Sequence, residues 1–587
     1  MEISTIGRPR NVGWVRAAAL MYGDWGTSKA YVLGLALLVV GYAALPHLLA
    51  VCFVTAVVGI NYIWVCRCFA TGGGVYTAAG LHSRRLAMVG GLLLLADYIV
   101  TASLSCLDAF HYLGFDQVHA KKWAISAIFL IGALNFFGPK HTGSIAVWLA
   151  LPVLTTVVVL IVAGVPHLKE FHPAPPTGGM WHNWVAFVGM ILALSGVEAA
   201  ASNTGVMKLD ADATPDRPSV RLTSRRAVTT VMLEVVIVTA LLSVLAMCLP
   251  LPADQLHTHK EDMLRYMGEV FVGPDFGKAV GWVFALLLLS AVNTAIGGMV
   301  ALLYVMARDR ELPDTFVQLN RFGVPWVPLI AATILPVVVL DVGDSVEALA
   351  SLYAIGVVGA IVLDIGSCAF ARTLPLSRGQ RRAMKLTVAL LAAIWLTIAL
   401  SKLYALLFVV IVLAVGLAIR EHTHRQRRHA AAAATPPTAT APGLTAGPAA
   451  ERPPFLGQSI LAAARGWTPA LQFALEESRI RGARLLVLYV REVAVNIDMS
   501  GNWQDDPDAR ALFTRLESEA PGLKVSKLYS VSDSPADTII DIAATFGVDA
   551  VVLGGSRRAT LVNLLKGNVV ARVAANLPES MHLIVIG

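Results

Sequence analysis

Two carboxylates flanked by glycine lie inside apolar segments, and they are the residues of this sequence best suited to chemistry. Asp24 stands between Gly23 and Gly26 in the first apolar segment, and Glu198 follows Gly196 in the sixth. Glycine weakens a helix by about 1 kcal/mol relative to alanine, so we expect both segments to break beside a carboxylate. Glycine-interrupted segments at matching positions of two halves are typical of a transport site at the membrane midplane.

A row of hydroxyls in the third apolar segment is expected to complete this site. Tyr98, Thr101 and Ser105 are spaced i, i+3 and i+7, so on a helix they share one face. With Ser195 and freed backbone carbonyls they would line an electronegative, oxygen-rich cage, which suits a small cation. A site for an amino acid would instead offer free amides and helix N-termini to the substrate carboxylate. The residues by themselves favour a monovalent cation.

The composition is that of a multi-pass membrane protein. The chain has 587 residues, of which 56% are hydrophobic and 14% charged, against roughly 25% charged in soluble domains. The net charge of +7 does not indicate nucleic-acid binding, because Lys and Arg gather in alternate short loops, as the positive-inside rule requires. We expect a protein of the cytoplasmic membrane with both termini in the cytoplasm, and no enzyme.

Twelve apolar segments are candidates for spanning helices. They cover residues 15–39, 48–65, 86–112, 123–137, 145–165, 185–207, 227–249, 279–306, 327–340, 346–370, 386–400 and 403–419. A basic run and an Ala/Pro-rich linker follow them. We therefore expect a transmembrane domain over 1–420, a linker over 421–454 and a soluble domain over 455–587.

The soluble domain alternates apolar strands with helices. Strands are expected over 459–464, 483–490, 524–531, 549–555 and 582–587, and helices over 470–481, 506–519, 535–546 and 561–576. This alternation predicts a parallel, doubly wound sheet covered by helices.

Three stretches of the membrane domain carry a family resemblance. "GGGVY" (72–76) and "ARDRELPDTFVQLNRFGVPWVP" (307–328) resemble the amino acid-polyamine-organocation (APC) superfamily. Within it, "YGDWGTSKAY" (22–31) looks like the signature of KUP-type potassium uptake permeases and bacterial potassium importers. The resemblance covers residues 1 to about 420. It implies an all-α fold of 12 transmembrane helices with a LeuT-like 5+5 inverted repeat, which performs K+/H+ symport by alternating access.

The resemblance also implies roles for single residues. K+ would be bound by the residues Asp24, Tyr98, Thr101, Ser105, Ser195 and Glu198, with no other metal. Asp24 and Glu198 would couple the proton, and Tyr31 would close the outer side.

Two positions depart from the permease signature, Trp25 and Lys29. The Lys29 ammonium could pair with Asp24, snorkel to the outer surface, or replace the transported cation with a fixed charge. The last option leaves an APC-type amino-acid or amine transporter as the alternative function. A membrane sensor that transports little is a further alternative.

The soluble domain resembles the universal stress protein fold. Its first strand ends without the aspartate of ATP-binding members, and the loop after the fourth strand reads "GGSRRATLVNLLKGN". The resemblance implies a homodimer through this domain, no required cofactor, and regulation by a nucleotide, either cyclic di-AMP or ATP. The residues that would hold the nucleotide are Ser556, Arg557, Arg558, Gly567 and Asn568.

Overall fold

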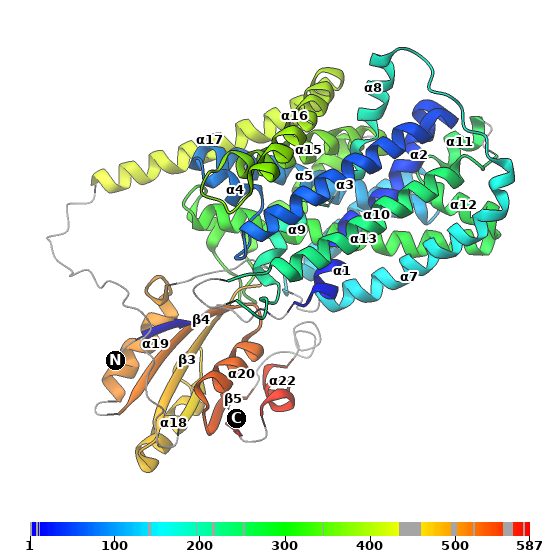
Figure 1. Ribbon diagram of the computed structural model, residues 1–587. Coiled ribbons are helices and arrows are strands. Elements are labelled where there is room, and N and C mark those ends of the chain that lie inside the picture. The colour runs from blue at the N-terminus through cyan, green and yellow to red at the C-terminus, as the bar shows by residue number, and fades with distance from the viewer. Residues whose placement is uncertain are drawn as a thin grey trace.

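The chain folds into a helical membrane domain followed by a C-terminal α/β domain (Figure 1). This computed structural model describes residues 3–586 except 7–9, 11, 139–141, 195, 214–217, 251–252, 344, 434–458, 495–501, 521–522, 556–567 and 579–580. The predicted combination of a polytopic helical domain with a parallel α/β domain is confirmed.

Long apolar helices build the membrane domain. They are α3 (Ala44–Cys68), α5 (Arg84–Tyr112), α6 (Gln117–Asn135), α7 (Thr142–Gly164), α10 (Arg221–Ala246), α13 (Pro274–Arg308), α14 (Trp326–Val342), α15 (Val346–Phe370), α16 (Arg378–Ser401) and α17 (Leu403–Ala433). Within the described ranges, eight helical runs are long and apolar enough to cross a membrane, and α14 is a shorter apolar helix. In the most apolar 18-residue stretch of α5, 89% of the residues are buried, against 17% in that of α17. The helix α5 is therefore central and α17 is peripheral.

Two helical runs are broken where the glycines predicted it. The first consists of α1 (Trp14–Trp25) and α2 (Ser28–Val40), with Gly26 and Thr27 between them. The second consists of α8 (Met180–Gly189), η3 (Ile191–Leu194), α9 (Ala199–Ser202) and η4 (Asn203–Val206). Short elements connect the rest: η1 (Gly41–Ala43), α4 (Val75–Gly80), η2 (Val165–Glu170), α11 (Ala253–His259), α12 (Met263–Phe271) and η5 (Asp314–Val317).

The C-terminal domain is a parallel sheet with helices on its faces. Its strands are β2 (Ser459–Ala463), β3 (Arg484–Glu492), β4 (Val525–Ser532), β5 (Ala550–Gly554) and β6 (His582–Ile586). Its helices are α18 (Pro469–Arg481), η6 (Trp503–Asp505), α19 (Pro507–Glu519), α20 (Pro535–Phe546) and α22 (Val569–Asn576). The predicted strands and helices are confirmed. Residues 561–567 of the last expected helix lie outside the described ranges.

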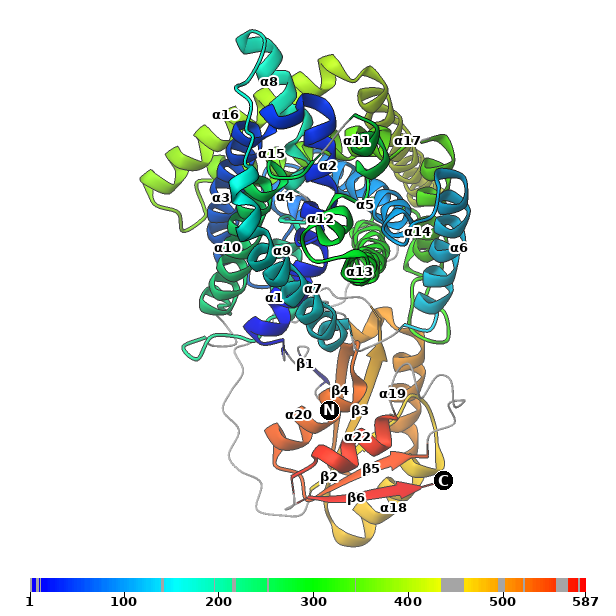
Figure 2. The same ribbon diagram turned by 90° about the vertical axis from the view of Figure 1, so that its right-hand side faces the viewer.

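A sixth strand comes from the other end of the chain. β1 (Ile3–Ile6) pairs in parallel with β4, from Ile3 beside Lys527 to Ile6 beside Ser530, and the sheet order is β1-β4-β3-β2-β5-β6. Both ends of the chain therefore lie on the same side of the membrane domain (Figure 2). We call this the tail side. The sequence did not predict β1, because a four-residue strand is recognisable only by the edge with which it pairs.

Candidate functional site

The two helix breaks lie in direct contact at the centre of the membrane domain. Gly196 has φ +84°, and a Cβ atom there would lie 2.3 Å from the backbone nitrogen of Trp25. Only glycine combines this left-handed backbone with so close an approach. Because Asp24 precedes Trp25 and Glu198 follows Gly196, this contact places both carboxylates at the junction of the two helix breaks.

Three buried carboxylates gather around this contact. Asp24 and Glu198 are joined by Asp97 of α5, and all three side chains are at most 4% exposed. They lie close enough to interact electrostatically. Among the described residues, neither carboxylate oxygen of Asp97 has a hydrogen-bond partner. Carboxylate charges at this depth cost several kcal/mol unless they are compensated, so the cluster is suited to receive protons or a cationic group.

The predicted hydroxyls differ in their relation to this cluster. Tyr98 lies beside the three carboxylates. The Thr101 hydroxyl donates to the Asp97 carbonyl at 2.9 Å, whereas the buried Ser105 hydroxyl has no hydrogen-bond partner within the described part of the chain. The Tyr31 hydroxyl lies 3.2 Å from the Thr27 hydroxyl, at the first break. Ser195 lies outside the described residues.

Sequence reasoning missed two members of the site, Asp97 and Tyr353. Asp97 lies within an apolar segment, but no glycine flanks it as Gly23 flanks Asp24, and its one signal was its place directly before Tyr98. Tyr353 of α15 is buried near the three carboxylates. A tyrosine in an apolar helix gives no comparable sequence signal.

Lys29 is paired with a residue that was not expected. Its Nζ lies 2.6 Å from Oε1 of Glu234 on α10, and the lysine side chain is 0% exposed. The Tyr22 hydroxyl donates to the same glutamate oxygen at 2.9 Å. The possibility that Lys29 snorkels to the outer surface is therefore wrong. Its charge is compensated by Glu234, from a helix 205 residues further along the chain.

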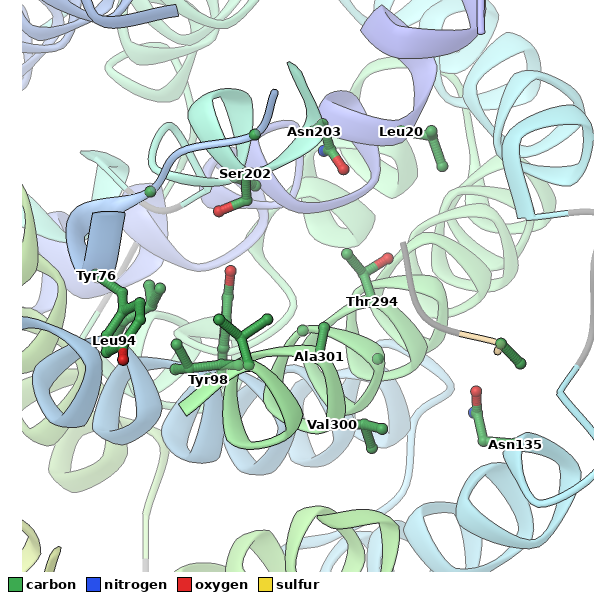
Figure 3. A pocket seen from close by; sticks show the side chains of 18 of the residues that line it. Leu20, Tyr76, Leu94, Tyr98, Asn135, Ser202, Asn203, Thr294, Val300 and Ala301 are labelled. Carbon is green, nitrogen blue, oxygen red and sulfur yellow. The ribbon is translucent and has the colours of Figure 1, made fainter. Parts of the chain in front are cut away.

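A cavity of about 230 Å³ is lined by Tyr98 (Figure 3) and also by Ala494 and Asp533 of the C-terminal domain, on the tail side. The Tyr98 and Ser202 side chains point toward each other at one part of it. The Asn135 amide donates to Asn293 at 2.7 Å, where α6 approaches α13. Asn203, Thr294 and the Gly72–Gly74 loop add further polar groups to its wall. The cavity thus extends from Tyr98, which lies beside the carboxylates, to the C-terminal domain, and its wall carries both polar and apolar groups.

At the edge of this cavity, Tyr76 donates to Asp309 at 3.1 Å, and Arg84 lies 3.2 Å from the same carboxylate. Burial, reinforced by Asp309, raises the pKa of the Tyr76 phenol above its ordinary value. Tyr76 is therefore a protonated donor at neutral pH.

Buried carboxylates at two broken helices, with a cavity lined by the neighbouring Tyr98, define a membrane transport protein. Residues 12–425 match the amino acid permease family, and the chain belongs to this family. It is a multi-pass transporter of the cell membrane and not an enzyme. Residues 467–584 match the universal stress protein family, which confirms the expected family resemblance of the C-terminal domain.

The lysine-specific permease LysP of Escherichia coli is a relative. It is 29% identical over 231 residues, which are 36% of this chain and 46% of that permease. The chain thus spans about half the length of this curated relative.

The prediction of a KUP-type K+/H+ symporter is wrong, because the family match is to amino acid permeases. The physical reason lies in the cage argument. Carboxylates and hydroxyls accept hydrogen bonds from an ammonium group as readily as they coordinate K+, so the inventory of oxygens does not distinguish the two cations. The step to K+ depended on the resemblance over 22–31 and on matching residues of the third and sixth segments.

The expected nucleotide site lies mostly outside the described residues, which exclude Ser556, Arg557, Arg558 and Gly567. Asn568 is described, and its side chain caps α22 by accepting from the backbone N–H groups of Val570 and Ala571 at 3.0 and 3.3 Å. Its side-chain oxygen is therefore used within the domain.

Proposed function

We propose that this permease carries a cationic substrate, a basic amino acid or an amine, across the cell membrane by alternating access. The observation that carries the proposal is the cluster of Asp24, Asp97 and Glu198, which is buried at the two helix breaks. A substrate ammonium group would compensate this negative charge and fill the hydrogen-bonding capacity of Asp97.

The pairing of Lys29 supports the same substrate class. Because Glu234 compensates Lys29, the lysine does not take the place of a substrate cation at the cluster. The relation to a lysine-specific permease points in the same direction. The 13-residue helix α2 begins at Ser28, beside the first break. Its N-terminal amides and dipole are suited to the carboxylate of an amino acid.

The finer architecture belongs to this proposal. We count α1–α2 and α8–α9 as one broken span each, which gives 12 spans with α3, α5, α6, α7, α10, α13, α14, α15, α16 and α17. The first ten would form a 5+5 inverted repeat with its broken members at equivalent positions. An even number of spans agrees with both termini on one side, which we assign to the cytoplasm. The domain limits would be 1–420, 421–454 and 455–587.

We propose roles for the remaining expected residues. Tyr98, Thr101, Ser105 and Ser195 would line the substrate path, and Tyr31 would close it on the outer side. Asp24 and Glu198 would bind and release the co-transported proton during each transport cycle. A thousandfold concentration ratio costs about 4.1 kcal/mol, while each entering charge gains about 2.3 kcal/mol per 100 mV. A cation carried with a proton can therefore be accumulated.

The soluble domain would pair two copies of the chain and respond to a nucleotide, and no cofactor would be required.

Uptake of radiolabelled lysine into proteoliposomes tests the proposal through Asp97. Asp97→Asn should reduce uptake at least about tenfold, since losing a hydrogen bond to a charged group costs about 1.5–3 kcal/mol. Asp108→Asn is the matched control. Asp108 is also fully buried on α5, but its acidic neighbours are Glu261 and Asp262 rather than the cluster. Equal uptake by the wild type and Asp97→Asn, or equal losses in both variants, would contradict the assignment.

A further inference from the structure

The C-terminal domain lies against the tail-side end of the transport cavity. We propose that this domain is a cover, which closes the cavity by docking on the membrane domain of its own chain and must move before substrate can leave or enter on that side. The proposal goes beyond the proposed substrate, because it concerns access to the cavity and not what passes through it.

The docking contact is a close approach of two backbones. The backbone N–H of Ala494, which follows β3, donates to the carbonyl of Gly323 at 2.8 Å. Gly323 lies between η5 and α14 and has φ +78°. A Cβ atom there would lie 2.3 Å from the carbonyl oxygen of Glu492. The absence of a side chain at Gly323 is thus a requirement of the docked arrangement.

An apolar patch extends the contact. Ala301 and Tyr304, in the last turns of α13, are buried in one apolar cluster with Val487, Tyr489 and Tyr529 of the C-terminal sheet. The core of the soluble domain is therefore continuous with the end of a membrane helix. Separating them would expose aromatic and aliphatic surface to water, which favours the docked state.

The cavity wall itself includes the cover. Ala494 and Asp533, which follow the carboxyl ends of β3 and β4, line the same cavity as Tyr98, Asn293 and Thr294. Thr294 is labelled in Figure 3 among the side chains that face this space. The soluble domain therefore forms part of the wall that a solute would pass on the tail side.

The N-terminal segment ties the cover to the broken helices. β1 belongs to the soluble sheet, and Val12 bonds to the end of the second broken run, accepting from Lys208 N–H at 2.8 Å. The helix α1 begins at Trp14. The six residue steps from Ile6 to Val12 span at most about 20 Å. A larger displacement of the sheet must either release β1 from β4 or pull on the start of α1.

Labelling of a cavity cysteine tests the cover without reference to any substrate. Thr294→Cys would be placed in the full chain and exposed, in inside-out membrane vesicles, to a membrane-impermeant maleimide. The parent chain, whose six native cysteines include the half-buried Cys68, gives the background rate. We expect slow labelling of the cavity cysteine in the otherwise unchanged chain.

Two glycine substitutions then separate docking from backbone strain. Gly323→Asn places a Cβ atom against Glu492, whereas Gly482→Asn is made at φ +61° with nothing within 4 Å. Asparagine tolerates both left-handed backbones. We expect Gly323→Asn to increase labelling of Thr294→Cys at least about tenfold and Gly482→Asn to leave it unchanged. If Gly323→Asn fails to fold, Ala494→Pro removes the same hydrogen bond from the other partner.

Each outcome decides the proposal. Protection in the otherwise unchanged chain, lost on Gly323→Asn or Ala494→Pro, supports a cover. Rapid labelling without either substitution shows that the cavity is open to water and overturns it. Protection that persists in both variants also overturns it, because the docking contact would then not control access. None of these results depends on whether lysine is transported, so failure of the proposed substrate is recognised separately.

Discussion

Removing one partner of the Lys29–Glu234 pair should strongly destabilise the membrane domain. The two charged atoms lie 2.6 Å apart, with side-chain exposures of 0% and 15%. At an effective dielectric constant of about 20, their attraction is about 6 kcal/mol. Desolvation of both groups offsets most of this gain, but a single substitution leaves the other charge buried without its partner, which costs about 3–5 kcal/mol.

The size of the loss should depend on which partner remains. Lys29→Met leaves Glu234 with its hydrogen bond from Tyr22 and some exposure. Glu234→Gln leaves a fully buried ammonium group and should be the more damaging substitution. The double variant should unfold within about 1 kcal/mol of the wild type, because replacing a whole buried pair is often neutral.

Unfolding of the purified protein in mixed micelles, followed by tryptophan fluorescence, gives the free energies for a double-mutant cycle. Lys278→Met provides a matched control, because Lys278 pairs with Asp275 at 3.1 Å on an exposed surface, with side-chain exposures of 66% and 94%. Such pairs contribute little. Additive losses in the double variant, with a coupling energy near zero, would refute the claim that Glu234 compensates Lys29.

The remaining predictions concern the backbone. Gly196→Ala should abolish transport and lower thermal stability in detergent, because its Cβ atom would lie 2.3 Å from the Trp25 nitrogen. The control Gly189→Ala should leave transport and stability unchanged, because nothing lies within 4 Å of its Cβ position. Equal effects of the two substitutions would contradict the contact between the two helix breaks. Ser345→Ala should lower the free energy of unfolding by about 1 kcal/mol, because the Ser345 hydroxyl accepts from the Ala348 N–H at the start of α15. The same micelle assay measures this value. An unchanged free energy of unfolding would show that this cap does not contribute.

The features that follow from local sequence could be predicted. The helix breaks arise from glycine beside a carboxylate, and the strands of the soluble domain arise from apolar runs between turn residues. The partner of Lys29 could not be predicted, because Glu234 lies on a distant helix and only tertiary packing brings the two together. β1 was missed for the same reason, since its pairing depends on the edge that β4 offers.

The substrate illustrates a different limit. The residues of the site indicated a cation, and the carboxylate cluster agrees with that chemistry. The step from cation to K+ depended on a resemblance over 22–31 and on matching residues of the third and sixth segments, and the family match over 12–425 overturned it. Asp97 was missed because no glycine flanks it, although its position directly before Tyr98 placed it beside the row of hydroxyls.

A counterflow assay with the wild-type protein, in proteoliposomes loaded with single unlabelled solutes, tests most directly whether the substrate is a cation. We predict that lysine or a linear diamine inside the vesicles drives uptake of labelled lysine, while leucine or glutamate at the same concentration does not. Exchange restricted to neutral or acidic amino acids would contradict the assignment of Asp24, Asp97 and Glu198 as the receptor of a substrate cation.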